Sequence, residues 1–364
     1  MKLDAVDRAA LQLWTGWRVA VAVLGAATAG VVRAGQDGYS WVERWNHWDV
    51  VHFVGIAQEG YAGEPTGVPN EAFLPGLPLL MRAGASLGLT EVVVGVAVSL
   101  VAGAVAAVAL ARLAERAVPG AGRWAVAGWL LAPTAVFLAA PYTEALFLAF
   151  ALPAWLAALD RRWMAAGLLA TAAMTVRVSA LFLVAALVVH WATTRPRRWQ
   201  DLSWLALTVV PLAVVVAAQR AATGSWTAWS DAQSSPEWSR SARPPWETVL
   251  NTWDAAFGGT VSDEYVWPFR LELVAVVVGL AVTAWCLRRR AWGETTFMAL
   301  NVGAFSFSFW YLSVPRAALL WWPLWIAVGS LIMGRPWVRA VWLGGSGALA
   351  AAWAVAFFSG AWAG

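Results

Sequence analysis

The chain has 364 residues, of which 60% are hydrophobic and only 13% are charged, and its formal net charge is +4. A soluble domain carries about 25% charged residues and lacks repeated apolar runs of the roughly 20 residues that cross a bilayer. These values exclude an ordinary soluble protein and predict an all-α polytopic membrane protein. Membrane β-barrels are built from short alternating segments, which this sequence lacks.

The charged residues and the cysteine content limit the partners and cofactors. The arginines lie in short clusters between apolar runs, a pattern that reports orientation in a membrane, so we expect no nucleic-acid partner. The single cysteine, Cys286, excludes a disulfide. The histidines are His47, His52 and His190. They are too few and too scattered for a histidine-rich metal centre, and we expect no metal and no cofactor.

Apolar runs predict the membrane spans in chain order. One stretch, 163–192, contains Arg177 and would be about 45 Å long as a single helix, well beyond a hydrocarbon core of about 30 Å. We therefore predict two short passes there, with Arg177 near their turn, and about eleven spans in total. The other predicted spans are 15–33, 91–111, 124–140, 143–159, 202–219, 269–287, 292–311, 316–333 and 338–358.

Orientation supports the two short passes. The N-terminus lacks a small-residue cleavage site and is interpreted as the cytoplasmic start of the first span. Two passes then place every arginine cluster on the cytoplasmic side, whereas one pass would turn the last two clusters outward, against the positive-inside rule. The C-terminus is expected outside. The clusters are Arg112/Arg116/Arg123, Arg161/Arg162, Arg195/Arg197/Arg198, Arg288/Arg289/Arg290 and Arg335/Arg339.

Two long segments of the single predicted domain, 1–364, are expected on the outer side. They are a first outer loop, 34–90, and a second outer loop, 220–268. Connections between packed helices usually have about two to eight residues, and longer ones tend to be functional. Both loops are rich in tryptophan, which favours the membrane interface. Polar side chains suited to catalysis or binding are therefore expected to gather at the outer surface.

The first outer loop contains WNHWDVVHFVGIAQEGY (45–61). As a helix ending at Glu59, with Trp45 one turn before Asp49, it places Asp49 and His52 on one face. Such a helix suits the membrane interface. Trp48 beside Asp49 would exclude water and make the carboxylate a better base. The alternative is a capping or solvated aspartate.

Other candidates are single charges near the outer ends of spans. Arg177 interrupts an apolar stretch, and a charge there is costly and marks a functional site by default; a side chain that reaches the interface is the alternative. Arg316 resembles it, and two outer arginines would bind a lipid-linked phosphate bidentately. Glu71 is a second acidic candidate or an N-terminal helix charge. Glu144, with Tyr142 beside it, would pair with an arginine or cap the following helix.

Six segments together resemble the PIG-V family, the GPI mannosyltransferase 2 group, which is glycosyltransferase family 76 of the GT-C superfamily. The resemblance runs from about residue 45 to about residue 330, and the composition indicates a bacterial homologue. The segments are WNHWDVVHFVGIAQEGY, EAFLPGLPLL, LAPTAVFLAAPYTEALFLAFAL, TVRVSALF, WSDAQSSPEWSR and SVPRAALLWWPLW.

The resemblance implies a GT-C fold with interfacial helices in the first outer loop. It implies transfer of mannose from polyprenyl-phosphate-mannose to a lipid-linked or cell-envelope acceptor, with inversion, at the outer face of a bacterial plasma membrane. Asp49 would be the general base. Expected substrate-binding residues are Trp48, His52, Glu71, Tyr142, Glu144, Arg177, Arg240 and Arg316.

The sequence departs from the family pattern at three positions. His52 and Leu74 stand where aromatic residues are usual, and Ala317 stands where a tyrosine usually follows the arginine. A transporter or lipid flippase is the alternative function. Transporters often show internal repeats and a midplane site, and neither is evident here.

Overall fold

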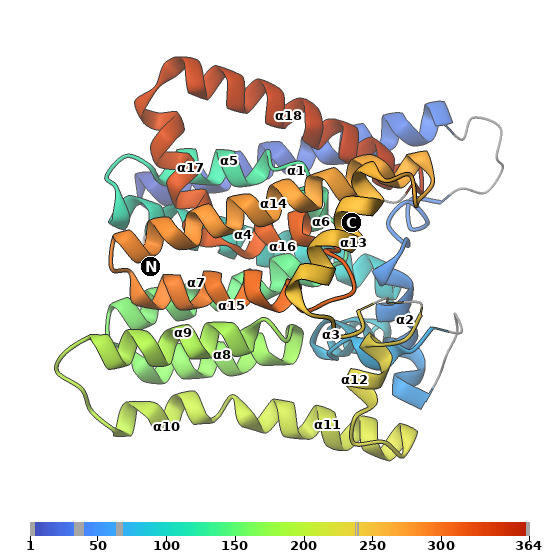
Figure 1. Ribbon diagram of the computed structural model, residues 1–364, viewed down its shortest axis with the longest axis horizontal. Helices are drawn as coiled ribbons and strands as arrows, with labels where there is room; N and C mark the ends of the chain where they lie inside the picture. The colour runs from blue at the N-terminus through green and yellow to red at the C-terminus, as the bar shows by residue number, and fades with distance from the viewer. Residues whose placement is uncertain (1–3, 33–39, 63–67, 237, 239, 362–364) are drawn as a thin grey trace. The chain divides into compact units, whose positions relative to one another are not determined.

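The computed structural model describes residues 4–32, 40–62, 68–236, 238 and 240–361. Over these residues the chain forms helices and no strand (Figure 1), which confirms the prediction of an all-α protein. The chain divides into two compact units. The prediction of a single GT-C domain over 1–364 stays a prediction.

Unit 1 comprises Met1–Ala57, Gly76–Leu156 and Leu319–Ala363. Among the described residues it contains most of α2 and α7 and seven other helices. These helices are α1 (Ala5–Val32), α2 (Asp49–Glu59), α3 (Gly76–Ala85), α4 (Glu91–Ala117), α5 (Gly122–Leu130), α6 (Val136–Ala139), α7 (Thr143–Leu159), α17 (Trp322–Gly334) and α18 (Pro336–Phe358).

Aromatic and small residues fix α1 against its neighbours in unit 1. Trp14 stacks on Trp129 with ring centroids 6.3 Å apart, and its Nε1 donates to the Leu100 carbonyl at 3.1 Å. A Cβ atom at Gly103 would lie 2.1 Å from the Trp14 ring. Only a residue without a side chain therefore lets α4 approach the indole so closely.

Unit 2 comprises Gln58–Pro75 and Ala157–Ala318. Its elements include both turns of the first outer loop and the helices of the second. They are η1 (Gly60–Ala62), η2 (Asn70–Ala72), α8 (Trp163–Val176), α9 (Ala180–Thr193), α10 (Gln200–Ala206), α11 (Val209–Thr223), α12 (Ala228–Gln233), α13 (Pro245–Phe257), α14 (Asp263–Arg288), α15 (Trp292–Phe305) and α16 (Val314–Ala317).

Among the residues that the structure describes, five helical segments are long and apolar enough to cross a membrane: α1, α4, α10 with α11, α14 and α18. The helical segment Val314–Leu320 meets α17 at a bend of 81°, and the two together count as a sixth span if they cross the membrane as one. Three further apolar helices, α7, α8 and α9, are shorter. Every predicted span falls on one or more of these helices or on α5, α6 and α15, and the total of about eleven stays a prediction.

The predicted break in the 163–192 stretch is confirmed. Helix α8 ends at Val176, and Arg177 follows it in an extended conformation, with φ −148° and ψ 144°. Helix α9 begins at Ala180 and packs back against α8. Two short helices therefore replace one helix that would exceed the hydrocarbon thickness.

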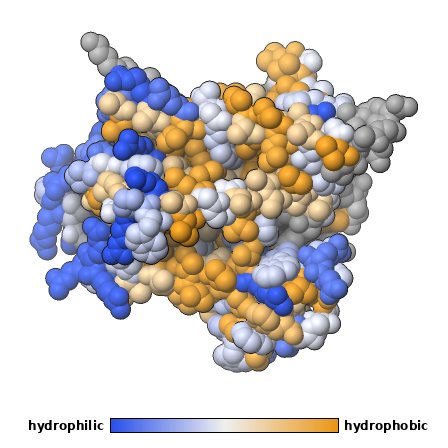
Figure 2. All heavy atoms as spheres, turned by 90° about the horizontal axis from the view of Figure 1, so that it is seen from above, coloured by the Kyte–Doolittle hydropathy of each residue, from blue (hydrophilic) through white to orange (hydrophobic). Residues whose placement is uncertain are grey.

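The surface agrees with insertion in a bilayer. Figure 2 shows many apolar side chains on the face in view. Exposed large hydrophobic residues occur along the outer sides of the spans, among them Val101, Val214 and Val277. Lipid chains solvate such a surface where water does not.

Candidate functional site

Asp49 is the first residue of α2. Trp48 before it has a left-handed backbone, with φ 56°, and the amide of Val50 donates to the His47 carbonyl at 3.2 Å. This turn starts the helix at Asp49 and leaves the aspartate half-buried. The helix ends at Glu59 as predicted. A carboxylate in the first helical turn is stabilised by the macrodipole.

Tyr142, in the sequence PYTEA (141–145), holds the turn before α2. Its hydroxyl donates to the His47 carbonyl at 3.4 Å, and its ring contacts Phe53 of α2 and Phe137 of α6, with centroids 6.2 and 4.8 Å apart. The side chain is 1% exposed. Tyr142 and Asp49 are thus brought together within unit 1, with Tyr142 supporting the backbone that presents the carboxylate.

The chain before Tyr142 is fixed by two polar side chains. Arg18 donates to the Ala139 carbonyl at 2.7 Å, and Ser99 donates to the Ala140 carbonyl at 2.7 Å. The bond from Arg18 satisfies a carbonyl at the end of the short helix α6, and the Ala140 carbonyl also accepts from the amide of Tyr142 at 2.7 Å. Glu144 follows in the first turn of α7 and is fully buried.

The tryptophans of the first outer loop have different surroundings. Trp45 is buried and contacts Phe358 of α18 at 5.0 Å, while His47 contacts Phe357 at 5.9 Å. The prediction that Trp45 lies on the helix that carries Asp49 is wrong, because the left-handed step at Trp48 separates them. Trp48 itself is 40% exposed, and His52 is buried.

In unit 2, backbone carbonyls within residues 69–73 of the first outer loop accept hydrogen bonds from side chains that are far away in the sequence. Trp238 donates to Pro69 at 3.2 Å, Gln219 to Glu71 at 2.9 Å and Gln233 to Ala72 at 3.1 Å. The donors come from α11, α12 and the segment after α12. Gln233 and Trp238 belong to the second outer loop, so one role of that loop is to fix part of the first.

The same contacts surround the predicted residues Glu71 and Arg240. Glu71 is 6% exposed, and the Arg240 amide donates to the Gln233 carbonyl at 3.2 Å. Tyr61 donates to the Phe73 carbonyl at 2.9 Å. Burial raises the pKa of the Tyr61 hydroxyl above its ordinary value, so the group remains a protonated donor to a higher pH than an exposed tyrosine does.

A buried acid that the sequence interpretation missed lies beside the turn that carries the predicted residue Arg316. Glu272 of α14 is 2% exposed and accepts from the amides of Ser313 and Val314, at the start of the helix that carries Arg316. The signal was present in the sequence, because a charge within a predicted span marks a functional site by default. Arg177 lies half-buried at the end of α8.

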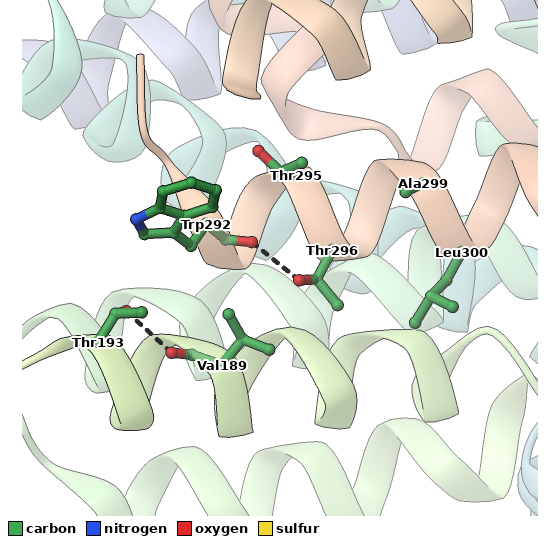
Figure 3. A pocket seen from close by; sticks show the side chains of 7 residues that line it. All are labelled: Val189, Thr193, Trp292, Thr295, Thr296, Ala299 and Leu300. Carbon is green, nitrogen blue, oxygen red and sulfur yellow. Dashed lines mark hydrogen bonds between the residues drawn. The ribbon is translucent and has the colours of Figure 1, made fainter. Parts of the chain in front are cut away.

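A groove of about 410 Å³ lies between α9 and α15 (Figure 3). It is lined by Val189, Thr193, Trp292, Thr295, Thr296, Ala299 and Leu300, none of which is a predicted site residue. The threonine hydroxyls donate to carbonyls of their own helices. The lining joins the end of α9 to the start of α15, so the clusters 195–198 and 288–290 share one end of unit 2, as the orientation argument predicts.

The predicted residues therefore fall into two sets. Unit 1 carries Trp48, Asp49, His52, Tyr142 and Glu144, and unit 2 carries Glu71, Arg177, Arg240 and Arg316. Within the part of the chain that the structure describes, no group of three or more His, Cys, Asp and Glu side chains has the arrangement of a metal site.

Comparison with known proteins identifies the family. The family described as Mannosyltransferase (PIG-V) matches residues 20–209, more than half of the chain, and confirms the resemblance found in the motifs. No curated protein and no solved structure matches the chain. The matched range contains α2 with Asp49, the PYTEA turn and Arg177. The chain belongs to the PIG-V family of mannosyltransferases, and is an integral-membrane glycosyltransferase that uses a sugar donor and a glycoconjugate acceptor.

Proposed function

We propose that the enzyme moves mannose from polyprenyl-phosphate-mannose to a lipid-linked or cell-envelope acceptor, with inversion. The reaction would take place at the outer face of a bacterial plasma membrane, with the N-terminus in the cytoplasm. The family match over residues 20–209 carries this proposal. The long tryptophan-rich loops support it, because a lipid-linked donor presents its sugar at the membrane interface.

Asp49 is proposed as the general base. In an inverting transfer the acceptor oxygen bonds to C1 of mannose as the bond from C1 to the phosphate oxygen breaks, and one carboxylate takes the hydroxyl proton. Asp49 suits this role because it is half-buried at the start of a helix whose backbone is fixed by Tyr142. Trp48 and His52 flank the carboxylate in sequence and are proposed to line the acceptor side.

The leaving group is already a phosphate, so it requires electrostatic stabilisation rather than protonation by an acid. Guanidinium groups match phosphate oxygens bidentately, and Arg240 and Arg316 are proposed for this role. Arg177 is proposed as a further phosphate contact. This mechanism needs neither a metal nor another cofactor.

The donor class is tested with purified protein in liposomes. Vesicles receive either polyprenyl-phosphate-[³H]mannose or a nucleotide-linked [³H]mannose, with a membrane lipid extract as acceptor. We expect label to enter glycoconjugate only from the polyprenyl donor. Transfer from the nucleotide sugar alone would refute the proposed donor, and movement of intact donor between leaflets without transfer would favour a flippase.

A further inference from the structure

Glu272 is a buried acid in the first half of a membrane-spanning helix, just before its apolar run LVAVVVGLAV. It lies in α14, which is long and apolar enough to cross a membrane, and only 2% of the residue is exposed. Removing a carboxylate from water costs several kcal/mol unless its oxygens are hydrogen-bonded and its charge is balanced. The contacts of Glu272 therefore show why an acid is tolerated there.

Both carboxylate oxygens accept backbone hydrogen bonds. Oε1 accepts from the amide of Ser313 at 2.7 Å, and Oε2 accepts from the amide of Val314 at 2.8 Å. Ser313 has a left-handed backbone, with φ 66°, which is costly for a residue with a side chain. The two bonds compensate for this conformation and fix the start of α16, which carries Arg316.

The two bonds act on the segment that carries an arginine. Arg316 follows Val314 by two residues in α16, so the turn that Glu272 fixes determines where the Arg316 side chain leaves the backbone. Each carboxylate oxygen accepts one of the two amides, and a side chain with a single acceptor oxygen would leave one of them unpaired.

We infer that Glu272 is the positioning residue for the donor phosphate, an inference that rests on the proposed function. Its bonds to Ser313 and Val314 fix the turn at the start of α16 before the donor binds and set the direction from which Arg316 approaches. When the donor binds, the phosphate contacts the guanidinium group of Arg316, and the carboxylate keeps its two backbone bonds.

The test measures donor affinity in full-length protein in nanodiscs, with polyprenyl-phosphate-mannose and with polyprenyl phosphate as separate probes. Glu272→Gln removes the charge and replaces one acceptor oxygen by an NH₂ group, which cannot accept the hydrogen bond of the backbone N–H that it faces. We expect at least a tenfold loss of affinity for both probes. Glu264→Gln, an exposed acid in the first turn of the same helix, is the matched control and should bind as the wild type does.

A double-mutant cycle separates positioning from a general structural role. If Glu272 acts through Arg316, adding Glu272→Gln to Arg316→Gln causes little further loss of affinity, because the two losses are not additive. Additive losses, or unchanged binding in Glu272→Gln, would overturn the inference while leaving the proposed function intact. If Glu272→Gln does not fold, Glu272→Asp is measured instead, because it retains the charge but places it one methylene group closer to the backbone of α14. If Glu272→Asp binds both probes as tightly as the wild type does, the inference is overturned. A wild type that binds neither probe would refute the proposed donor and this inference together.

Discussion

Replacing Asp49 by asparagine separates its catalytic role from its place in the helix. The amide has nearly the shape of the carboxylate, so packing around α2 is retained. A general base typically contributes a factor of about 10² to 10⁴ to the rate, which corresponds to about 3–5.5 kcal/mol in the barrier. A carboxylate at a helix N-terminus stabilises the helix by only about 0.3–1 kcal/mol.

These magnitudes predict a large loss of activity with little loss of stability. Asp49→Asn should lower the initial rate of [³H]mannose transfer by about 10² to 10⁴, while its thermal midpoint stays within a few degrees of the wild type. The measurement uses purified protein in liposomes at saturating polyprenyl-phosphate-mannose. Equal yields on size-exclusion chromatography confirm that both proteins are folded.

Glu59→Gln is the matched control, because it removes an exposed carboxylate from the other end of the same helix. It should leave the transfer rate unchanged. A transfer rate for Asp49→Asn within tenfold of the wild type would refute the assignment of the base. Equal losses in the two variants would show that the effect comes from the helix and not from the carboxylate.

Two further predictions concern packing and the loop contacts. A Cβ at Gly329 would lie 2.6 Å from the backbone nitrogen of Ala125, so Gly329→Ala should overpack α5 against α17 by about 1–3 kcal/mol and lower the thermal midpoint. Gly344→Ala, at a site with open space, should not lower it, and equal midpoints would contradict the packing argument. Trp238→Phe keeps an aromatic ring beside Phe73 but removes the bond to Pro69. It should speed proteolysis of the first outer loop with little change in the thermal midpoint. Unchanged cleavage would contradict the idea that the bond from Trp238 to Pro69 holds this loop.

Local signals predicted the parts of the fold that depend on neighbouring residues. The break at Arg177 followed from the length of the apolar stretch and the cost of a charge within it. The end of α2 at Glu59 followed from the glycine after it, since Gly60 has φ 75° and favours a helix end. The left-handed step at Trp48 had no such signal, because non-glycine residues rarely adopt it.

The contacts that hold residues 69–73 were beyond prediction for a different reason. Gln219 and Gln233 reach carbonyls 148 and 161 residues away in sequence, and Trp238 reaches one 169 residues away. Backbone carbonyls carry no information about residue type, so no motif identifies the acceptor of such a bond. The composition of the second loop predicted an interfacial segment, whereas its role in holding residues 69–73 required the structure.

Glu272 shows that a charge within a predicted span can be interpreted only together with its contacts in the folded chain. The rule that singled out Arg177 applies equally to an acid in α14, and applying it to both signs would have added Glu272 to the candidates. It would not have identified its partners, because they are backbone amides at a left-handed turn, 41 and 42 residues further along the chain. A buried charge is tolerated only where such partners converge. The position of Glu272 therefore carries information about the turn before Arg316 that the arginine motif does not carry alone.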